Sequence, residues 1–246
     1  MLWLAAAASS AGAADRPDPI AEARSLYNQH QYLAAINAAE RARLLPARAD
    51  SADLIAARAY LERFRESAAS DDLTNARMRL TRLNPQGFTP RERVELIVGL
   101  GEALYFGESY GAAADIFASA LDTADGPTGD ARERVLDWWA TAVDSLARPR
   151  ADIERQGIYE RVRDRMRAEL AERTGSAAAA YWLAAAARGK GDLQAAWEAA
   201  EAGWVRSPLT SDRGVRLRAD LDQLMLRAVV LERARALGQP FENLRL

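Results

Sequence analysis

Apolar residues along this chain recur at the spacing of helices rather than at the alternation of strands. Almost no segment alternates with a period of two, and runs of β-branched residues are absent. The spacing i, i+3, i+4 places apolar side chains on one face of a helix. Two of the clearest stripes are Ala57, Tyr60, Leu61, Phe64 and Ile158, Val162, Met166, Leu170. The pattern therefore predicts an all-α fold.

Three segments share a finer pattern, in which a turn precedes a helix with small or apolar residues at fixed spacing. These segments carry Tyr32, Ala35, Ala39, Ala42, Pro46; Tyr110, Ala113, Phe117, Ala120, Leu121; and Gly191, Asp192, Ala196, Ala200, Pro208. Equivalent alanines are 78 residues apart (35 to 113) and 83 residues apart (113 to 196). The gaps have room for one further, less regular hairpin each.

This arrangement resembles the tetratricopeptide repeat (TPR), a helical hairpin of about 34 residues. The resemblance is best in residues 16–47, 94–127 and 177–208. It implies a TPR-like α-solenoid of about five helical hairpins plus a C-terminal capping helix, in a single domain over residues 15–246. The segment from about Gly214 to Leu237 suits the cap, because Leu217, Leu221 and Leu224 form one apolar stripe. Asp71 or Asp72 is expected to cap a helix that runs toward Pro85.

In this family the first helix of each hairpin lines a concave groove that holds peptides. The resemblance therefore implies a non-enzymatic protein-interaction module whose partner is another protein or peptide. By register, the groove residues are Arg24, Tyr27, Asn28, Glu102, Tyr105, Phe106, Tyr181 and Arg188. For Tyr105 and Phe106, packing between hairpins is an alternative interpretation. Neither a cofactor nor a metal ion is expected.

Tryptophan is concentrated in the C-terminal half of the chain, at Trp138, Trp139, Trp182, Trp197 and Trp204. In a helical stripe such residues usually belong to the core. An aromatic cluster can also stack on sugar rings. A helical solenoid that binds a small molecule or a glycan is therefore the alternative function.

Two short motifs suggest chemistry but lack its context. Glu108-Ser109 resembles the catalytic Glu-Ser of lytic transglycosylases, yet the downstream element of that family is absent, and the repeat register places Glu108 in a hairpin turn. Gly189-Lys190-Gly191 resembles a fragment of a phosphate loop, but Gly191 stands where serine or threonine is needed. We therefore expect no enzyme.

The composition of the chain argues against nucleic acid and metal ions as binding partners. The formal net charge is −2, and the arginine run of residues 161–167 is interleaved with acidic residues. This favours a solvated, salt-bridged face over a nucleic-acid-binding surface. The chain contains no cysteine and one histidine, His30, which excludes disulfides and makes a histidine-based metal cluster implausible.

The N-terminus has the pattern of an export signal. A short apolar run beginning at Leu2 is followed by a small-x-small cleavage pattern at Ala11-Gly12-Ala13, which predicts a signal peptide over residues 1–14. No stretch of the chain is long and apolar enough to predict a transmembrane helix. We expect a periplasmic or secreted protein, or a cytoplasmic one if residues 1–14 are not a signal.

Overall fold

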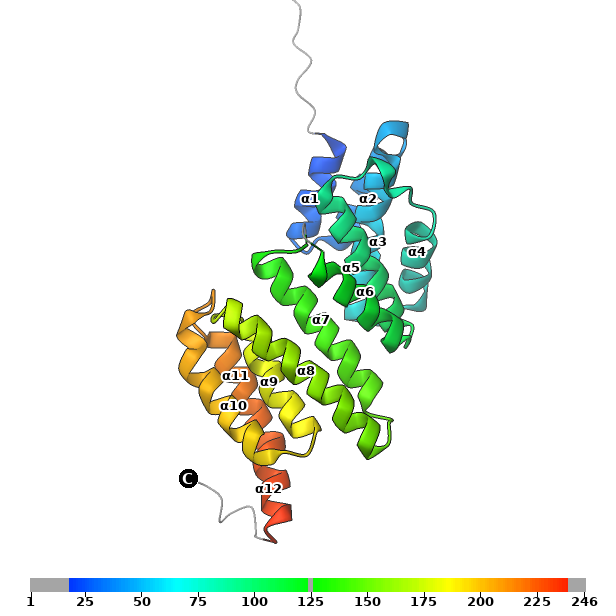
Figure 1. The fold of residues 1–246 in the computed structure, drawn as a ribbon. Coiled ribbons are helices and arrows are strands. Elements are labelled where there is room, and N and C mark those ends of the chain that lie inside the picture. The colour runs from blue at the N-terminus through cyan, green and yellow to red at the C-terminus, as the bar shows by residue number, and fades with distance from the viewer. Residues whose placement is uncertain (1–17, 124–125, 239–246) are drawn as a thin grey trace, which may run out of the picture. The chain divides into compact units, whose positions relative to one another are not determined.

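The computed structural model describes residues 18–123 and 126–238, and this part of the chain is helical, with no strand (Figure 1). The all-α prediction is confirmed. Neighbouring helices pack in pairs along the chain. The α-helices are α1 (Pro19–Asn28), α2 (Tyr32–Arg43), α3 (Ala49–Ser67), α4 (Ser70–Leu80), α5 (Pro90–Phe106), α6 (Tyr110–Asp122), α7 (Gly129–Ala147), α8 (Asp152–Glu172), α9 (Ala177–Gly189), α10 (Leu193–Arg206), α11 (Val215–Leu224) and α12 (Val230–Ala236).

Local sequence signals explain where several helices begin. At α5, Thr89 and Glu92 form a reciprocal capping box. At α10, the Asp192 carboxylate accepts a hydrogen bond of 2.9 Å from the backbone N–H of Ala195. The predicted cap of α4 is wrong by two or three positions, because the N-cap position is Ala69. That helix begins at Ser70, so Asp71 and Asp72 lie in its first turn, where their charges complement the positive end of the helix dipole.

The three segments with the shared sequence pattern have the same turn geometry. In each turn a backbone N–H closes onto a carbonyl five residues earlier, at 3.0 Å, which is the longer hydrogen bond of a Schellman motif. The three donor and acceptor pairs are Gln31 and Leu26, Ser109 and Leu104, and Asp192 and Ala187. One residue of each turn has positive φ: His30 (60°), Glu108 (61°) and Gly191 (88°). The predicted hairpin turns are therefore confirmed at all three places.

Small residues allow close helix contacts where the sequence predicts them. Ala35, Ala113 and Ala196 are each 0% exposed. At Gly101, an added Cβ would lie 2.5 Å from a ring carbon of Phe117, so only glycine lets α5 approach α6 this closely.

The chain divides into two compact units, with the boundary between Gly87 and Phe88. In the first unit, helices α1 to α3 bury an alanine-rich core that includes Ile20 and Ile55. Helix α4 packs against α3. Arg79, in the last turn of α4, and Arg82, just after its end, reach the buried carboxylate of Asp53 on α3. The Arg79 Nη1–Oδ1 distance is 2.5 Å and the Arg82 Nη2–Oδ1 distance is 2.8 Å.

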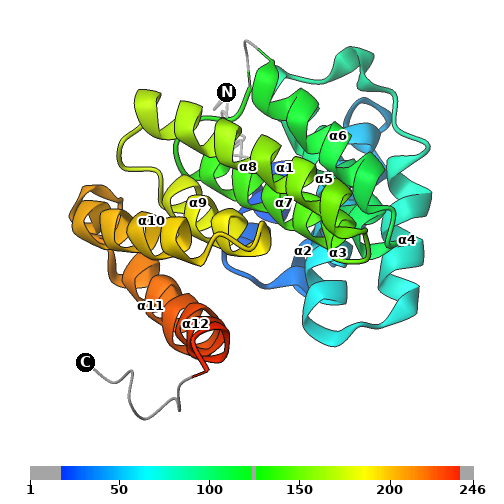
Figure 2. The same cartoon turned by 60° about the horizontal axis from the view of Figure 1, so that its bottom comes forward.

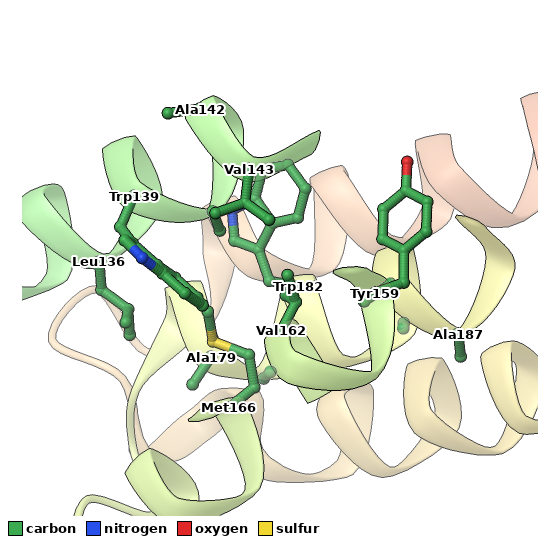
Figure 3. Close-up of a cluster of buried hydrophobic side chains, with 14 of the residues drawn as sticks. Leu136, Trp139, Ala142, Val143, Tyr159, Val162, Met166, Ala179, Trp182 and Ala187 are labelled. Atoms are coloured by element: carbon green, nitrogen blue, oxygen red, sulfur yellow. The ribbon is translucent and has the colours of Figure 1, made fainter. Parts of the chain in front are cut away.

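In the second unit, one apolar core extends from α5 to the π-helical segment after α11, and α7, α8 and α9 contribute many of its side chains. Figure 3 shows Trp139 of α7, Met166 of α8 and Trp182 of α9 within this core. Trp139 and Trp182 are each 8% exposed, which confirms the core interpretation for these two residues. Helix α9 contacts both α7 and α11. Figure 2 shows α11 beside α10, with which it is also in contact.

The predicted closing helix is interrupted. A π-helical segment, Met225–Val229, separates α11 from α12. The apolar stripe is as predicted, because Leu217, Leu221 and Leu224 are all buried. The π segment inserts a wider turn into the helix, which changes the direction in which the residues after it point.

Candidate binding cleft

A cleft of about 810 Å³ lies in the second unit, along one side of α7, α9 and α11. Residues from Asp130 to Thr141 of α7 form one wall, and residues from Arg216 to Leu224 of α11 form the opposite wall. Tyr181 and Trp182 of α9 lie between them, and the segment Thr210 to Asp212 closes one end. The volume is within the range of small-molecule and side-chain pockets.

Two acidic residues of α7 hold α9 in place. Glu133 Oε2 accepts a hydrogen bond of 3.0 Å from the backbone N–H of Ala178, in the first turn of α9. The indole N–H of Trp182 donates a hydrogen bond of 2.7 Å to Asp137 Oδ1. Because both bonds join the same two helices one turn apart, they fix the rotation of α9 and hence the position of Tyr181.

A third carboxylate at the cleft serves as a helix cap. Asp212 accepts hydrogen bonds from the backbone N–H groups of Gly214 and Arg216, each at 3.0 Å, and from the Thr210 hydroxyl at 2.8 Å. The bond from Arg216, followed by the bond from Thr210, lowers the pKa of Asp212. This carboxylate is therefore occupied in starting α11.

Asp137 on the α7 wall and Asp220 on the α11 wall are both exposed to solvent in the cleft. Partial burial between the walls raises the pKa of Asp137. The bond from Trp182 lowers this pKa and the charge of Asp220 raises it. Burial likewise raises the pKa of Asp220, while Arg216 lowers it and Asp212 raises it. Neither residue forms an ion pair within the described part of the chain.

Tyr181 lies within the field of both carboxylates. Its pKa is raised by burial first, and then by the charges of Asp220 and Asp137. All three side chains line the same cleft, so an aromatic ring shares this surface with two negative charges.

Of the predicted groove residues on α9, one lines the cleft and one does not. Tyr181 is part of its wall. Arg188 lies nearly two turns further along and pairs with Glu232 of α12, with an Nη2–Oε1 distance of 2.5 Å. Arg188 thus connects α9 to the last helix, an interaction that the register argument does not anticipate.

The predicted residues of α5 lie mainly in packing positions. Glu102 is 6% exposed. The ring centroids of Tyr105 and Phe106 are 5.1 Å and 5.6 Å from that of Trp138 on α7. This geometry agrees with the alternative interpretation, in which both aromatic residues pack between helices. A binding role for them stays a prediction.

The predicted residues of α1 belong to the first unit. The Tyr27 hydroxyl donates a hydrogen bond of 3.3 Å to Glu62 of α3, and the guanidinium of Arg58 lies 4.7 Å from the ring centroid of Tyr27. Arg24 is half-buried, whereas Asn28 is exposed. These contacts give Tyr27 a packing role between α1 and α3.

Sequence reasoning missed the acidic residues of the cleft. Glu133 and Asp137 belong to the less regular hairpin, where no register could be carried over from the resemblance. A signal was nevertheless present in the sequence. Asp130, Glu133, Asp137 and Thr141 of α7 are spaced three or four residues apart, as are Arg216, Asp220, Gln223 and Arg227 near α11. Each set is a polar stripe beside an apolar face.

The motifs that suggested chemistry are placed in turns. Glu108 is exposed, in the turn between α5 and α6. Gly191 follows a helix and not a strand. Among residues 18–123 and 126–238, no three His, Cys, Asp or Glu side chains are grouped as metal ligands. Within the same ranges, no helix has the length and apolar character needed to cross a membrane.

Comparison with known proteins gives no relative for this chain: no protein family, curated protein or solved structure matches it. The functional argument therefore depends on the geometry of the cleft.

Proposed function

We propose that this chain is a TPR-like binding module that holds a segment of another protein in the cleft along α7, α9 and α11. The observation that carries the proposal is the identity of the walls. Helices α7 and α9 are the first helices of successive pairs, the surface on which the resemblance places a peptide groove, and α11, which belongs to the closing segment, completes the cleft.

The repeated turn geometry supports a TPR-like solenoid. Three turns share one set of backbone hydrogen bonds although their sequences differ. In such an array each hairpin buries its apolar face on its neighbour, and the last one needs a cap. We propose that α11 and α12 form this cap, because the stripe Leu217, Leu221 and Leu224 is buried while Asp222 on the same helix is exposed.

We propose a non-enzymatic role and export to the periplasm or cell envelope. Five acidic residues, three arginines and a tyrosine line the cleft, and its lining residues include no histidine and no assembled nucleophile pair or oxyanion site. The predicted signal, residues 1–14, lies outside the described residues, and the single domain over residues 15–246 stays a prediction. N-terminal sequencing of the protein purified from its own cells tests export. An N-terminus near Ala14 supports it, and an intact Met1 contradicts it.

A screen with short random peptides displayed on phage tests the binding function. Peptides selected on the full chain are then titrated by fluorescence anisotropy against two variants. Gln223→Trp fills the cleft from an exposed position on its wall. Leu226→Trp is the matched control, because Leu226 is 62% exposed and does not line the cleft.

The proposal predicts that Gln223→Trp weakens binding about tenfold or more, because it removes the space for the peptide. Leu226→Trp should leave the affinity unchanged. If no peptide is selected, or if both variants bind equally well, the cleft is not a peptide site. A screen of sugars and peptidoglycan fragments then tests the alternative, glycan-binding function. That alternative is less favoured, because Trp182 is buried and its indole N–H is already bonded to Asp137.

A further inference from the structure

More acidic than basic side chains line the cleft, and its carboxylates differ in how many hydrogen bonds they already accept. Five acidic residues and three arginines line it. Of the acids, Asp212 accepts backbone hydrogen bonds on both oxygens at the start of α11, and Glu133 accepts one on Oε2 from the first turn of α9. Asp137 uses one oxygen for Trp182, and no hydrogen bond within the described residues engages its other oxygen.

We propose that the cleft selects a partner segment with a basic side chain, whose cation lies between Asp137 and Asp220 beside the ring of Tyr181. This inference rests on the proposed function and adds the chemistry of the occupant. The partner is a lysine- or arginine-containing segment of another protein.

Electrostatics favours a cation at this position. Asp137 and Asp220 repel each other, and each raises the pKa of the neighbouring tyrosine. A positive charge placed between them relieves this repulsion and is attracted by both carboxylates. The aromatic ring of Tyr181 adds a further favourable contact for a guanidinium or ammonium group.

The shape of the walls suits a long basic side chain. Tyr181, Leu217 and Leu224 supply apolar surface beside the carboxylates. Lysine and arginine place their methylene stems along such surface while the charged end reaches a polar group. The three arginines of the cleft, Arg134, Arg216 and Arg227, are exposed, as are Asp137 and Asp220, but the five acidic residues of the lining outnumber them. A preference for acidic segments would require these arginines to dominate over the two central carboxylates.

The indole N–H of Trp182 provides a direct readout, because it donates to Asp137. We would record the ¹H–¹⁵N spectrum of the full chain and assign this signal with Trp182→Phe. The probe is N-acetyl-arginine amide, compared with N-acetyl-norleucine amide and N-acetyl-glutamate amide. The inference predicts a saturable shift with the arginine compound alone, and loss of that shift in Asp137→Asn and Asp220→Asn.

Asp222→Asn is the matched control, since it removes the same charge from an exposed position of α11 outside the cleft. It should leave the response to the arginine compound unchanged. An unaltered Trp182 signal with the arginine compound, an equal shift with norleucine, or a preference for the glutamate compound would overturn the inference. The spectra of the variants also show whether each one is folded.

The second measurement uses the selected peptides whose binding is weakened by Gln223→Trp. Replacing their basic residue by norleucine should weaken binding about tenfold, and so should Asp220→Asn. The two changes together should cost little more than either alone, because both remove the same interaction. If cleft-binding peptides lose no affinity in Asp137→Asn or Asp220→Asn, the proposed function stands and the inference of a basic occupant fails.

Discussion

Carboxylates in two regions of this protein have opposite surroundings. In the first unit, Asp53 is 5% exposed and is held by Arg79 and Arg82 of the same unit. In the second unit, Asp137 and Asp220 are accessible to solvent in the cleft, and no arginine pairs with them within the described residues. A buried charge without a partner is strongly unfavourable, whereas a charge in an open cleft is hydrated until a ligand arrives.

The comparison teaches which charges stabilise the fold and which remain available for a partner. Arg79 also contacts Glu40, and Arg43 lies 3.5 Å from Asp53, so the charges of the first cluster are paired within the unit. In the cleft, Asp137 and Asp220 can still accept hydrogen bonds or an ion pair from a ligand. Charges of the first kind should matter for stability, and those of the second kind for binding.

The largest expected effect is that of Asp53→Asn. It removes the charge that neutralises the buried guanidinium of Arg79 and should destabilise the first unit by about 3 kcal/mol or more. The tryptophans of the described chain all lie in the second unit. Urea unfolding followed by circular dichroism should therefore show an earlier transition, while tryptophan fluorescence reports the second unit separately. The exposed Asp71, replaced by Asn, is the control. A midpoint as high as that of the unmodified protein would contradict the buried ion cluster.

A similar loss of stability is expected from Glu169→Gln. Glu169 is a carboxylate of the second unit that is paired in the same way as Asp53. Burial alone would raise the pKa of Glu169, but hydrogen bonds from Arg132 and Arg173 lower it to about 2. A pKa that falls from 4.5 to about 2 corresponds to about 3 kcal/mol of stability. Because the folded-state pKa is depressed, this stability is present above pH 4.5 and is lost as the pH falls toward 2.

Urea midpoints from tryptophan fluorescence, measured from neutral pH down to pH 2, check this prediction. The difference between the unmodified protein and Glu169→Gln should shrink as the pH falls through this window. Glu172 pairs with the same Arg173 at an exposed position, so Glu172→Gln should change the stability by less than about 1 kcal/mol. A difference that stays constant with pH would exclude the ion pair as its cause.

The smallest effect is expected from Asp137→Asn. Since burial and Asp220 raise the pKa of Asp137, its charge opposes folding at neutral pH. Asparagine keeps an oxygen for the Trp182 bond, so stability should be unchanged or should rise by about 0.5 kcal/mol. Urea unfolding followed by fluorescence measures it. A loss of several kcal/mol would mean that Asp137 belongs with Asp53, as a charge on which the fold depends.

Much of the fold could be predicted from the sequence, because helix formation depends on local spacing and local turn chemistry. The stripes of apolar residues, the glycine at Gly101 and the turns around Glu108 and Gly191 are all where the pattern places them. The dependence on local signals also explains where the predicted helix boundaries were wrong. Position along the chain could not specify that α4 begins at Ser70, or that a π segment divides the closing helix.

The candidate site was predicted only in part. The choice of first helices as the lining surface identified Tyr181, but Arg188 pairs with Glu232, and Tyr105 packs on Trp138. Such pairs join residues far apart in the chain. A side chain that looks available in a repeat register can therefore be occupied by a neighbour that the register does not specify.

The sequence by itself determined the all-α character, the repeated turns and the small residues at close helix contacts, since each depends on residues within a few positions of one another. Only the tertiary structure decided which polar groups are satisfied and which are left open. Asp53 and Asp137 are both acidic residues on helices, and nothing local separates them. The packing of α4 brings two arginines to the first, and the arrangement of α7, α9 and α11 leaves the second beside Asp220 in a cleft.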